Sequence, residues 1–304
     1  MVAKQAAKAH QFGGQWTSAK LSVLAQYLKA YTTALKDKPS AGHPFRKAYI
    51  DAFAGTGYRT LASEGEGAEA LLFPDLAEPA PQELLDGSAR LALKTTPRFD
   101  RYIFIEWSAK RCAALEALKQ EFPELAKDTR IEQEDANTKI QELCRKNWRS
   151  SRAVLFLDPY GMQVEWETIE AIAGTKAIDL WLLFPLGIGV NRLLTRTGTI
   201  PQSWQRRLDR LLGTQAWRDD LYEVQTTSTL FGEEKKRVVK VAVEKIGRYF
   251  NDRLKMVFAG VADEPGVLRN STNSPLYLLC FAAGNAKGAP IALKIANHLL
   301  KEVR

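Results

Sequence analysis

Residues 158–161 read Asp-Pro-Tyr-Gly and follow the apolar run 153–157, which has the composition of a buried strand. An acid at the end of such a strand lies at the carboxyl edge of a sheet, where open α/β folds bind their ligands. An exocyclic amine is a poor nucleophile because its lone pair is delocalised into the ring. Hydrogen bonds to the Asp158 carboxylate and to a carbonyl near Pro159 would localise that lone pair, and Tyr160 would stack on the ring. These three residues predict chemistry on the amino group of a flat substrate.

A second motif, Asp-x-Phe-x-Gly-x-Gly, begins at Asp51 and includes Phe53, Gly55 and Gly57. It follows a predicted strand, so its glycines would let the backbone pass close beside a bound nucleoside. Two closely spaced glycines suffice when no pyrophosphate has to be cradled. The motif therefore favours S-adenosylmethionine over NAD as the cofactor.

Acidic residues end the next two predicted strands. Glu106 could accept hydrogen bonds from both ribose hydroxyls, but it lies 49 residues after Gly57, where about 20 are expected. Leaving out the 27 residues of the insertion 60–86 reduces this spacing to 22. Asp135, followed by Ala136, is placed to accept from an adenine amino group. We therefore expect the cofactor to be bound by Asp51, Phe53, Gly55, Gly57, Glu106, Asp135 and Ala136.

Strand and helix patterns alternate along the chain as βαβ units do. They predict an α/β, doubly wound, Rossmann-like class I methyltransferase sheet, mostly parallel with an antiparallel C-terminal edge strand, plus a helical insertion. The expected strands are 46–54, 100–106, 130–134, 153–157, 177–184, 256–261 and 276–282. The expected helices are 88–94, 108–122, 138–147, 166–174, 235–254 and 287–303. One domain, 1–304, is expected to carry an N-terminal helix at 16–36, an acidic surface loop at 60–87 and a basic helical insertion at 187–234.

The charge of the chain is unevenly distributed. The net charge is +8, while 60–87 contains seven acids and no Lys or Arg, so the remainder carries +15. A body this basic suits a nucleic acid, although solubility explains a high pI as well. Its candidate phosphate contacts are interleaved with Trp204 and Trp217, and a solvated helix face is an equally good interpretation: Arg192, Arg196, Arg206, Arg207 and Arg210. The acidic segment is expected to be a mobile loop beside the active site.

Other classes of protein are disfavoured by composition. No apolar run reaches the roughly 18–20 residues of a membrane span, and the first ten residues lack the apolar core of a secretory signal. The three cysteines, Cys112, Cys144 and Cys280, are far apart, and with three histidines they form no zinc or iron–sulfur spacing. A cytoplasmic protein without a metal is expected.

The succession of these motifs resembles the three-Cys-motif partner protein family over nearly the whole chain. It rests on Trp16, Lys20-Leu21, Asp51 to Gly57, Asp86-Gly87-Ser88, Glu106, Leu157 to Gly161 and Asp179-x-Trp181-x-x-Phe184-Pro185. The resemblance implies a bacterial methyltransferase-fold protein that works with a partner carrying a three-cysteine, radical-S-adenosylmethionine-like motif. Those cysteines belong to the partner and not to this chain.

The Asp158 loop is similar to the DPPY loop of N6-adenine and N4-cytosine methyltransferases but lacks the second proline. It is closer to the DPFG-type loop of tRNA guanine-N2 methyltransferases, so the base and the kind of nucleic acid stay open. The leading hypothesis is a methyltransferase acting on an exocyclic amine of a nucleic-acid base. The alternatives are a cofactor-binding subunit of the three-Cys-motif partner, whose presence activity could require, and a protein or small-molecule methyltransferase.

Overall fold

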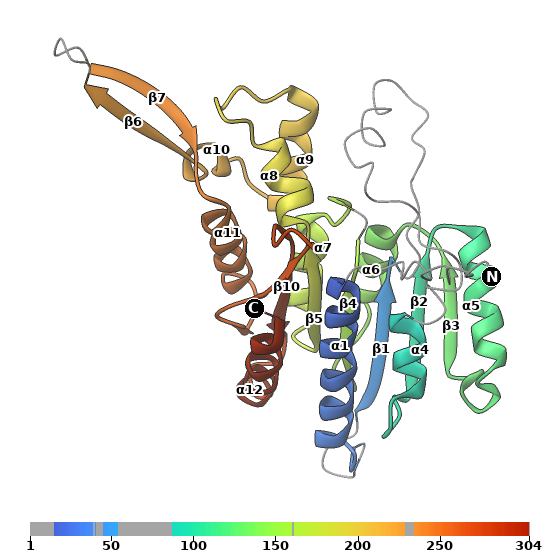
Figure 1. Ribbon diagram of the computed structural model, residues 1–304. Coiled ribbons are helices and arrows are strands. Elements are labelled where there is room, and N and C mark those ends of the chain that lie inside the picture. Colours follow the sequence, from blue (N-terminus) through green and yellow to red (C-terminus); the bar gives the residue numbers. More distant parts are fainter. Residues whose placement is uncertain are drawn as a thin grey trace, which may run out of the picture.

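The computed structural model describes residues 15–38, 40, 45–53, 87–159, 161–228 and 234–303 (Figure 1). Its strands are β1 (Arg46–Ala52), β2 (Arg101–Glu106), β3 (Thr129–Gln133), β4 (Ser151–Leu157), β5 (Ile178–Phe184), β6 (Tyr222–Ser228), β7 (Glu234–Lys240), β8 (Gly260–Val261), β9 (Gly266–Arg269) and β10 (Pro275–Ala283). Its longer helices are α1 (Gln15–Ala34), α4 (Ser88–Lys94), α5 (Ala109–Gln120), α6 (Ala136–Cys144), α7 (Trp166–Gly174), α9 (Gln202–Leu212), α11 (Val243–Lys255) and α12 (Ala289–Leu300). Short turns of helix are η1 (Pro123–Leu125), η2 (Leu186–Val190), α8 (Asn191–Leu193), α10 (Trp217–Asp220) and η3 (Lys301–Val303).

The main sheet has the strand order β3-β2-β1-β4-β5-β10-β8, with β9 also paired to β10. Strands β1 to β5 are parallel to their neighbours, whereas β10 runs antiparallel to β5, β8 and β9. The chain winds outward from β1 in both directions, so the order reverses between β1 and β4. This is the doubly wound, Rossmann-like sheet of the class I methyltransferases, with its antiparallel strand near the C-terminal edge.

Helices cover both faces of the sheet because side chains of its central strands are buried alternately on either side. Helices α1, α4, α5 and α12 share one hydrophobic cluster with Tyr49, Phe156 and Trp181 of the strands. Helices α6, α7, α9 and α11 share the other cluster with Ile50 and Leu155. Figure 1 shows α1 lying along the sheet with its first turns near the end where β1 finishes.

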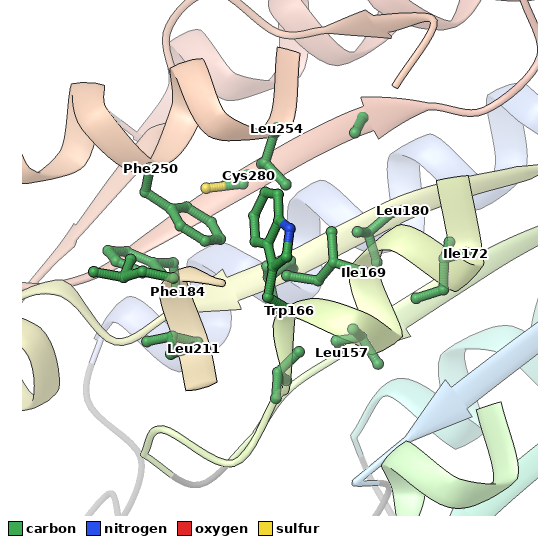
Figure 2. Close-up of a cluster of buried hydrophobic side chains, with 14 of the residues drawn as sticks. Leu157, Trp166, Ile169, Ile172, Leu180, Phe184, Leu211, Phe250, Leu254 and Cys280 are labelled. Atoms are coloured by element: carbon green, nitrogen blue, oxygen red, sulfur yellow. The ribbon is translucent and has the colours of Figure 1, made fainter. Parts of the chain in front are cut away.

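The second cluster is built around aromatic side chains (Figure 2). The rings of Phe184 and Phe250 stack with centroids 3.9 Å apart, and Trp166 meets Phe250 edge-on at 6.3 Å. Gly213 ends α9 with φ +65°, and a Cβ at that position would lie 2.0 Å from the Trp166 ring. Glycine is therefore required there by both conformation and space.

Helix α1 is fixed to the sheet by a buried polar contact. The Tyr27 hydroxyl donates to Asp179 Oδ2 at 2.9 Å, and the Gly284 N–H donates to Oδ1 at 3.2 Å. Because Asp179 lies at the start of β5, this contact is at the opposite edge of the sheet from the ends of the parallel strands. Its role is to hold a helix on the sheet and not to bind a ligand.

The segment after η2 differs from the sequence prediction. Residues 235–254 were expected to form one helix, but β7 occupies the first part and α11 begins only at Val243. The segment 187–234, expected to be helical, ends in β6, which pairs with β7. Helical spacing of apolar residues in α11 extends by chance into the β-branched run around Val238, and a ribbon with no buried face gives no alternating pattern.

Smaller differences occur elsewhere. The expected strand 256–261 is only Gly260–Val261, and Gly266–Arg269 is an additional strand. The expected acidic loop lies outside the described residues except for its last residue, Gly87. Within the described part, no helix is both long and apolar enough to cross a membrane.

We expect Asp179→Asn to flatten the pH dependence of stability. Burial raises the pKa of Asp179 from 3.8 to about 6. Between these values the unfolded chain releases the proton and the folded chain keeps it, so wild-type stability falls as the pH rises through this window. The asparagine can still accept from Gly284 and can donate to the Tyr27 oxygen.

The free energy of unfolding of the variant relative to wild type should therefore increase by about 2 kcal/mol between pH 4 and pH 7. Urea titrations at several pH values measure this difference, with Asp252→Asn as an exposed control. A difference that does not change with pH would contradict the assignment.

Candidate functional site

The ends of four parallel strands meet at one edge of the sheet. Asp51 on β1 lies opposite Phe104 of β2 and Phe156 of β4, which places the ends of these strands side by side. Glu106 is the last residue of β2, and Asp158 directly follows β4. The strand order reverses between β1 and β4, and this is where open α/β sheets bind ligands.

Asp158 is paired with a residue from the far end of the sequence. The Lys20 ammonium donates to Asp158 Oδ2, and the two side chains are 8% and 23% exposed. Within the described residues, the other oxygen of Asp158 accepts no hydrogen bond. The sequence prediction of Asp158 as an acid at the strand end is consistent with this geometry, but its cationic partner was not predicted.

Lys20 reaches the site because α1 lies across this part of the sheet. It begins the buried stripe of α1 that continues with Val23, Leu24, Tyr27 and Leu28. Its ammonium lies 5.1 Å from the centroid of the Trp16 ring, a distance suited to a cation–π interaction. A lysine at an apolar-stripe position was the available sequence signal, because a cation is buried there only with a partner.

Asp51 is the second carboxylate of this cluster. It is fully buried, and its Oδ2 accepts a 2.9 Å hydrogen bond from the Tyr49 hydroxyl. Burial raises its pKa from 3.8 to about 7, with the charge of Asp158 acting in the same direction and that of Lys20 opposing it. A buried carboxylate, Asp51, therefore lies close to the Lys20–Asp158 ion pair at the point where the strand order reverses.

Glu106 and Trp107 form a second part of the edge. Glu106 is 2% exposed and accepts the Ser108 backbone N–H at 2.6 Å, whereas the next side chain, Trp107, is 52% exposed. A large aromatic surface beside a buried acid can stack on a flat heterocycle. Trp107 was not among the predicted site residues, although its position directly after the predicted ribose acid was a usable signal.

Asp135 begins α6 and has a structural role there. Its Oδ1 accepts from both the N–H and the hydroxyl of Thr138, at 3.0 and 3.1 Å, which caps the helix. Oδ2 takes no part in the cap, so the predicted contact with an adenine amino group is sterically compatible with it. The next residue, Ala136, is buried in the core.

Asn137 connects this helix start to the loop that follows Asp158. Its amide donates to the Gln163 carbonyl at 2.9 Å, and its carbonyl accepts from the Glu165 N–H and the Thr168 hydroxyl, both at 3.0 Å. It is 7% exposed. One buried amide thus fixes the connection between the loop after Asp158 and α7, which composition alone did not reveal.

Two backbone conformations turn the chain sharply at this edge. Phe53 has φ +62° immediately after β1, which is a strained conformation for a non-glycine residue. Gly161 has φ +73°, so the fourth residue of the Asp158 loop needs the freedom of glycine. Pro159, which follows Asp158 in the loop after β4, is buried. The predicted site residues Gly55, Gly57 and Tyr160 lie outside the described residues.

The predicted phosphate contacts differ in exposure. Arg192, Arg196 and Arg206 are exposed, Arg207 is half-buried, and Arg210 lies 3.8 Å from Glu165. Trp217, one of the two tryptophans interleaved with them, is 1% exposed, and its indole N–H donates to Asp209 at 2.8 Å. Its ring fills the core beneath α9 and is not available to stack on a base.

The described residues at this edge fit an S-adenosyl compound. Asp51 Oδ1 is buried and has no hydrogen-bond partner among the described residues, so this oxygen is available to a bound ligand. Glu106 and Trp107 offer an acid and an aromatic surface at the next strand end. The described part of the chain contains no group of three or more His, Cys, Asp or Glu side chains arranged to hold a metal.

No protein-family model matches the chain, and no curated protein matches it. Among solved structures, a Legionella pneumophila protein of the DUF519 family model is 13% identical, with a TM-score of 0.41 over 96% of this chain and 94% of that one. Thermotoga maritima spermidine synthase is 11% identical, with a TM-score of 0.37 over 90% of this chain and 60% of that one. Magnesium protoporphyrin IX methyltransferase from Synechocystis PCC 6803, with bound SAM, is 14% identical, with a TM-score of 0.29 over 77% and 85%. Because these scores are below 0.5, the fold class rests on the strand order of the chain itself.

We expect the Lys20–Asp158 pair to contribute measurably to stability. Lys20→Met leaves the part-buried Asp158 carboxylate without its cation, whereas Lys20→Met combined with Asp158→Asn removes most of that penalty. Double-mutant cycles by urea unfolding should give a coupling of about 1–2 kcal/mol.

The matched control is the Lys245–Glu223 pair, with a 2.7 Å contact but side chains 48% and 53% exposed. Its coupling should stay below about 0.5 kcal/mol. Additive effects at Lys20 and Asp158 would show that the ion pair is not formed in solution.

Proposed function

We propose that the protein is an S-adenosylmethionine-dependent methyltransferase acting on an exocyclic amino group of a nucleic-acid base. The observation that carries the proposal is the position of Asp158, which follows β4 at the strand-order reversal beside the buried Asp51. The class I methyltransferase sheet supports it, and the basic charge of the chain favours a nucleic acid as substrate.

The cofactor site in this proposal is built by the ends of β1, β2 and β3. Glu106 would accept from the ribose hydroxyls, Trp107 would stack on the adenine, and Asp135 would accept from the adenine amino group through Oδ2. Asp51 would accept a hydrogen bond through its unpartnered Oδ1. When bound, S-adenosylmethionine supplies an electrophilic methyl group on its sulfonium centre.

Asp158 and Lys20 would act together on the substrate amine. With Lys20 on Oδ2, Oδ1 of Asp158 can accept one N–H of the amine, which orients the nitrogen lone pair. The nitrogen would form its new bond to the methyl carbon as the methyl–sulfur bond breaks and leaves its electron pair on sulfur. The nitrogen then carries a proton to be lost, and Asp158 can accept that proton through the same oxygen. Lys20 is therefore a positioning residue that fixes the carboxylate from the opposite side.

The same ion pair favours a second candidate function. Because Lys20 already occupies one oxygen of Asp158, the chain could bind the cofactor without catalysing methyl transfer by itself. In that case the three-Cys-motif partner would have to move α1 before Asp158 could receive a substrate. Single-turnover methyl transfer with and without the partner distinguishes the two functions, because the first requires a rate for this chain alone.

We expect Glu106→Gln to weaken cofactor binding by about 10–100-fold, since a charge-assisted hydrogen bond to ribose contributes roughly 1.5–3 kcal/mol. The amide keeps an acceptor for Ser108, so the fold should be retained. Titration calorimetry measures the affinity, and quenching of the half-exposed Trp107 reports occupancy independently.

The control is Glu116→Gln on the exposed face of α5, which should bind within twofold of wild type. No binding of S-adenosylmethionine to the wild type, alone or with its partner, would exclude both functions above.

We expect Asp158→Asn to lower single-turnover methyl transfer by two or more orders of magnitude, the usual scale for a positioned acid–base or electrostatic group. Cofactor affinity should change less than about threefold, because other strand ends build that site. The measurement uses labelled methyl donor with DNA and RNA pools, and Asp128→Asn at the opposite sheet edge is the control. Wild-type rates in Asp158→Asn would leave the loop a structural turn.

A further inference from the structure

Strands β6 and β7 form a two-stranded ribbon that is separate from the main sheet. Figure 1 shows it projecting from the molecule beside α8 and α9, at the end toward which β1 points. Its root is anchored: the Tyr222 hydroxyl donates to the Thr195 carbonyl at 3.0 Å, and Lys240 Nζ donates to the Asn191 carbonyl at 2.8 Å. The ribbon is therefore a fixed arm on the same end of the molecule as Asp158.

Close to its root, this arm carries a pair of apolar side chains that the rest of the chain covers only in part. Val224 and Val238 are directly paired across the two strands and are 64% and 42% exposed. A two-stranded ribbon has no second layer to bury such a pair, and an isolated ribbon is marginally stable in water. The pair is too small to mark a contact surface by itself, but it gives the ribbon an apolar surface beside its cationic side chains.

The charge of the region identifies the chemistry of that molecule. Residues 191–240 contain ten Lys or Arg and six Asp or Glu, and β7 alone supplies Lys235, Lys236, Arg237 and Lys240. Two of the acids are neutralised locally, since Asp209 pairs with Arg218 at 2.9 Å and Glu223 with Lys245 at 2.7 Å. The remaining excess of positive charge suits a polyanion.

Cations also meet at the root of the arm. Burial lowers the pKa of Lys240, and the nearby charge of Arg196 lowers it further. Arg196 is exposed, and it lies in the same segment, 191–200, that anchors the ribbon. A folded protein tolerates such like-charge proximity at a cost, which an anionic partner would offset.

We propose that the β6–β7 ribbon is a DNA-binding arm that holds a double-stranded segment beside the target base; this inference rests on the proposed function. The major groove of B-form DNA, about 12 Å wide, admits a two-stranded ribbon, whereas the major groove of A-form RNA is too narrow for side chains to read. Val224 and Val238 contact thymine methyl groups, and Arg196 contacts the phosphates at the root. Duplex DNA held in this way presents a base for extrusion toward Asp158.

The test measures binding of the full chain to fluorescent 30-base-pair DNA by anisotropy at several salt concentrations, without cofactor. Two variants address the arm: Arg196→Glu, and Val224→Glu combined with Val238→Glu. Each should weaken duplex binding by tenfold or more, and Arg196→Glu should also reduce the dependence of log affinity on log salt by about one. All three residues are exposed and lie outside the hydrophobic core, so the main unfolding transition should stay near the wild-type melting temperature, although the paired glutamates repel each other locally on the ribbon.

Matched control variants show whether an effect on DNA binding comes from the position of the substitution on the arm or only from the change in charge or side-chain shape. Arg98→Glu makes the same charge change at the opposite edge of the sheet, and Val224→Thr with Val238→Thr keeps β-branched side chains on the ribbon. Both should bind within about threefold of wild type. Competition with duplex RNA and with single-stranded DNA of the same sequence measures the preference for B-form DNA.

Equal DNA affinity of the arm variants and wild type would overturn the inference, as would a preference for RNA or for single strands. Cofactor binding by the same variants is measured in parallel and should equal that of wild type. Loss of DNA binding with intact cofactor binding therefore supports the arm. If the cofactor binds and DNA binding is the same in the arm variants and the wild type, the proposed function is retained and the DNA-binding arm is rejected. If the cofactor does not bind, the proposed function is rejected, and the DNA-binding result still decides the inference about the arm.

Discussion

The ion pair between Lys20 of the first helix and Asp158 after β4 is formed next to a second, fully buried carboxylate, Asp51 of β1. Asp51 and Asp158 come from adjacent parallel strands, so their side chains cannot be moved far apart. Leaving the part-buried Asp158 carboxylate without its cation would cost several kcal/mol. Lys20 supplies the cation across 138 positions of sequence, and Tyr27 holds the same helix to Asp179 at the other edge. Helix α1 is therefore part of the site as well as of the core.

The loop after Asp158 has to be exposed to a substrate and yet hold one geometry. Regular hydrogen bonding cannot provide this, because the strand has ended and α7 has not begun. Instead, the side-chain amide of Asn137 donates to the Gln163 carbonyl and accepts from the Glu165 N–H. Gly161 adopts a left-handed conformation that residues with a side chain disfavour. The conformation of this loop therefore depends on α6 as well as on β4, and a substitution of Asn137 would change the position of the loop that carries Asp158.

Local patterns in the sequence determine where the parallel strands end. Apolar runs typical of buried strands end in acids, so the positions of Glu106 and Asp158 at strand ends could be predicted without coordinates once the insertion 60–86 was discounted. The partner of Lys20 could not, because a lysine within an apolar stripe indicates that a partner exists but does not identify a residue 138 positions away. The ribbon was missed for the opposite reason: without a buried face, β7 has no alternation, and the true periodicity of α11 extended over it.

Electrostatics poses a problem that the arrangement of charges resolves. A polyanionic substrate is repelled by carboxylates, yet the proposed chemistry requires an acid at the reacting amine. Lys20 neutralises Asp158, and the pKa of Asp51 is raised to about 7, so near neutral pH much of the second charge is absent. The centre of the site is then close to neutral within a chain of net charge +8. In the proposed function, the field that attracts phosphates would arise from Arg196, Lys240 and their neighbours, which are displaced from the acids, so attraction and chemistry would use different residues.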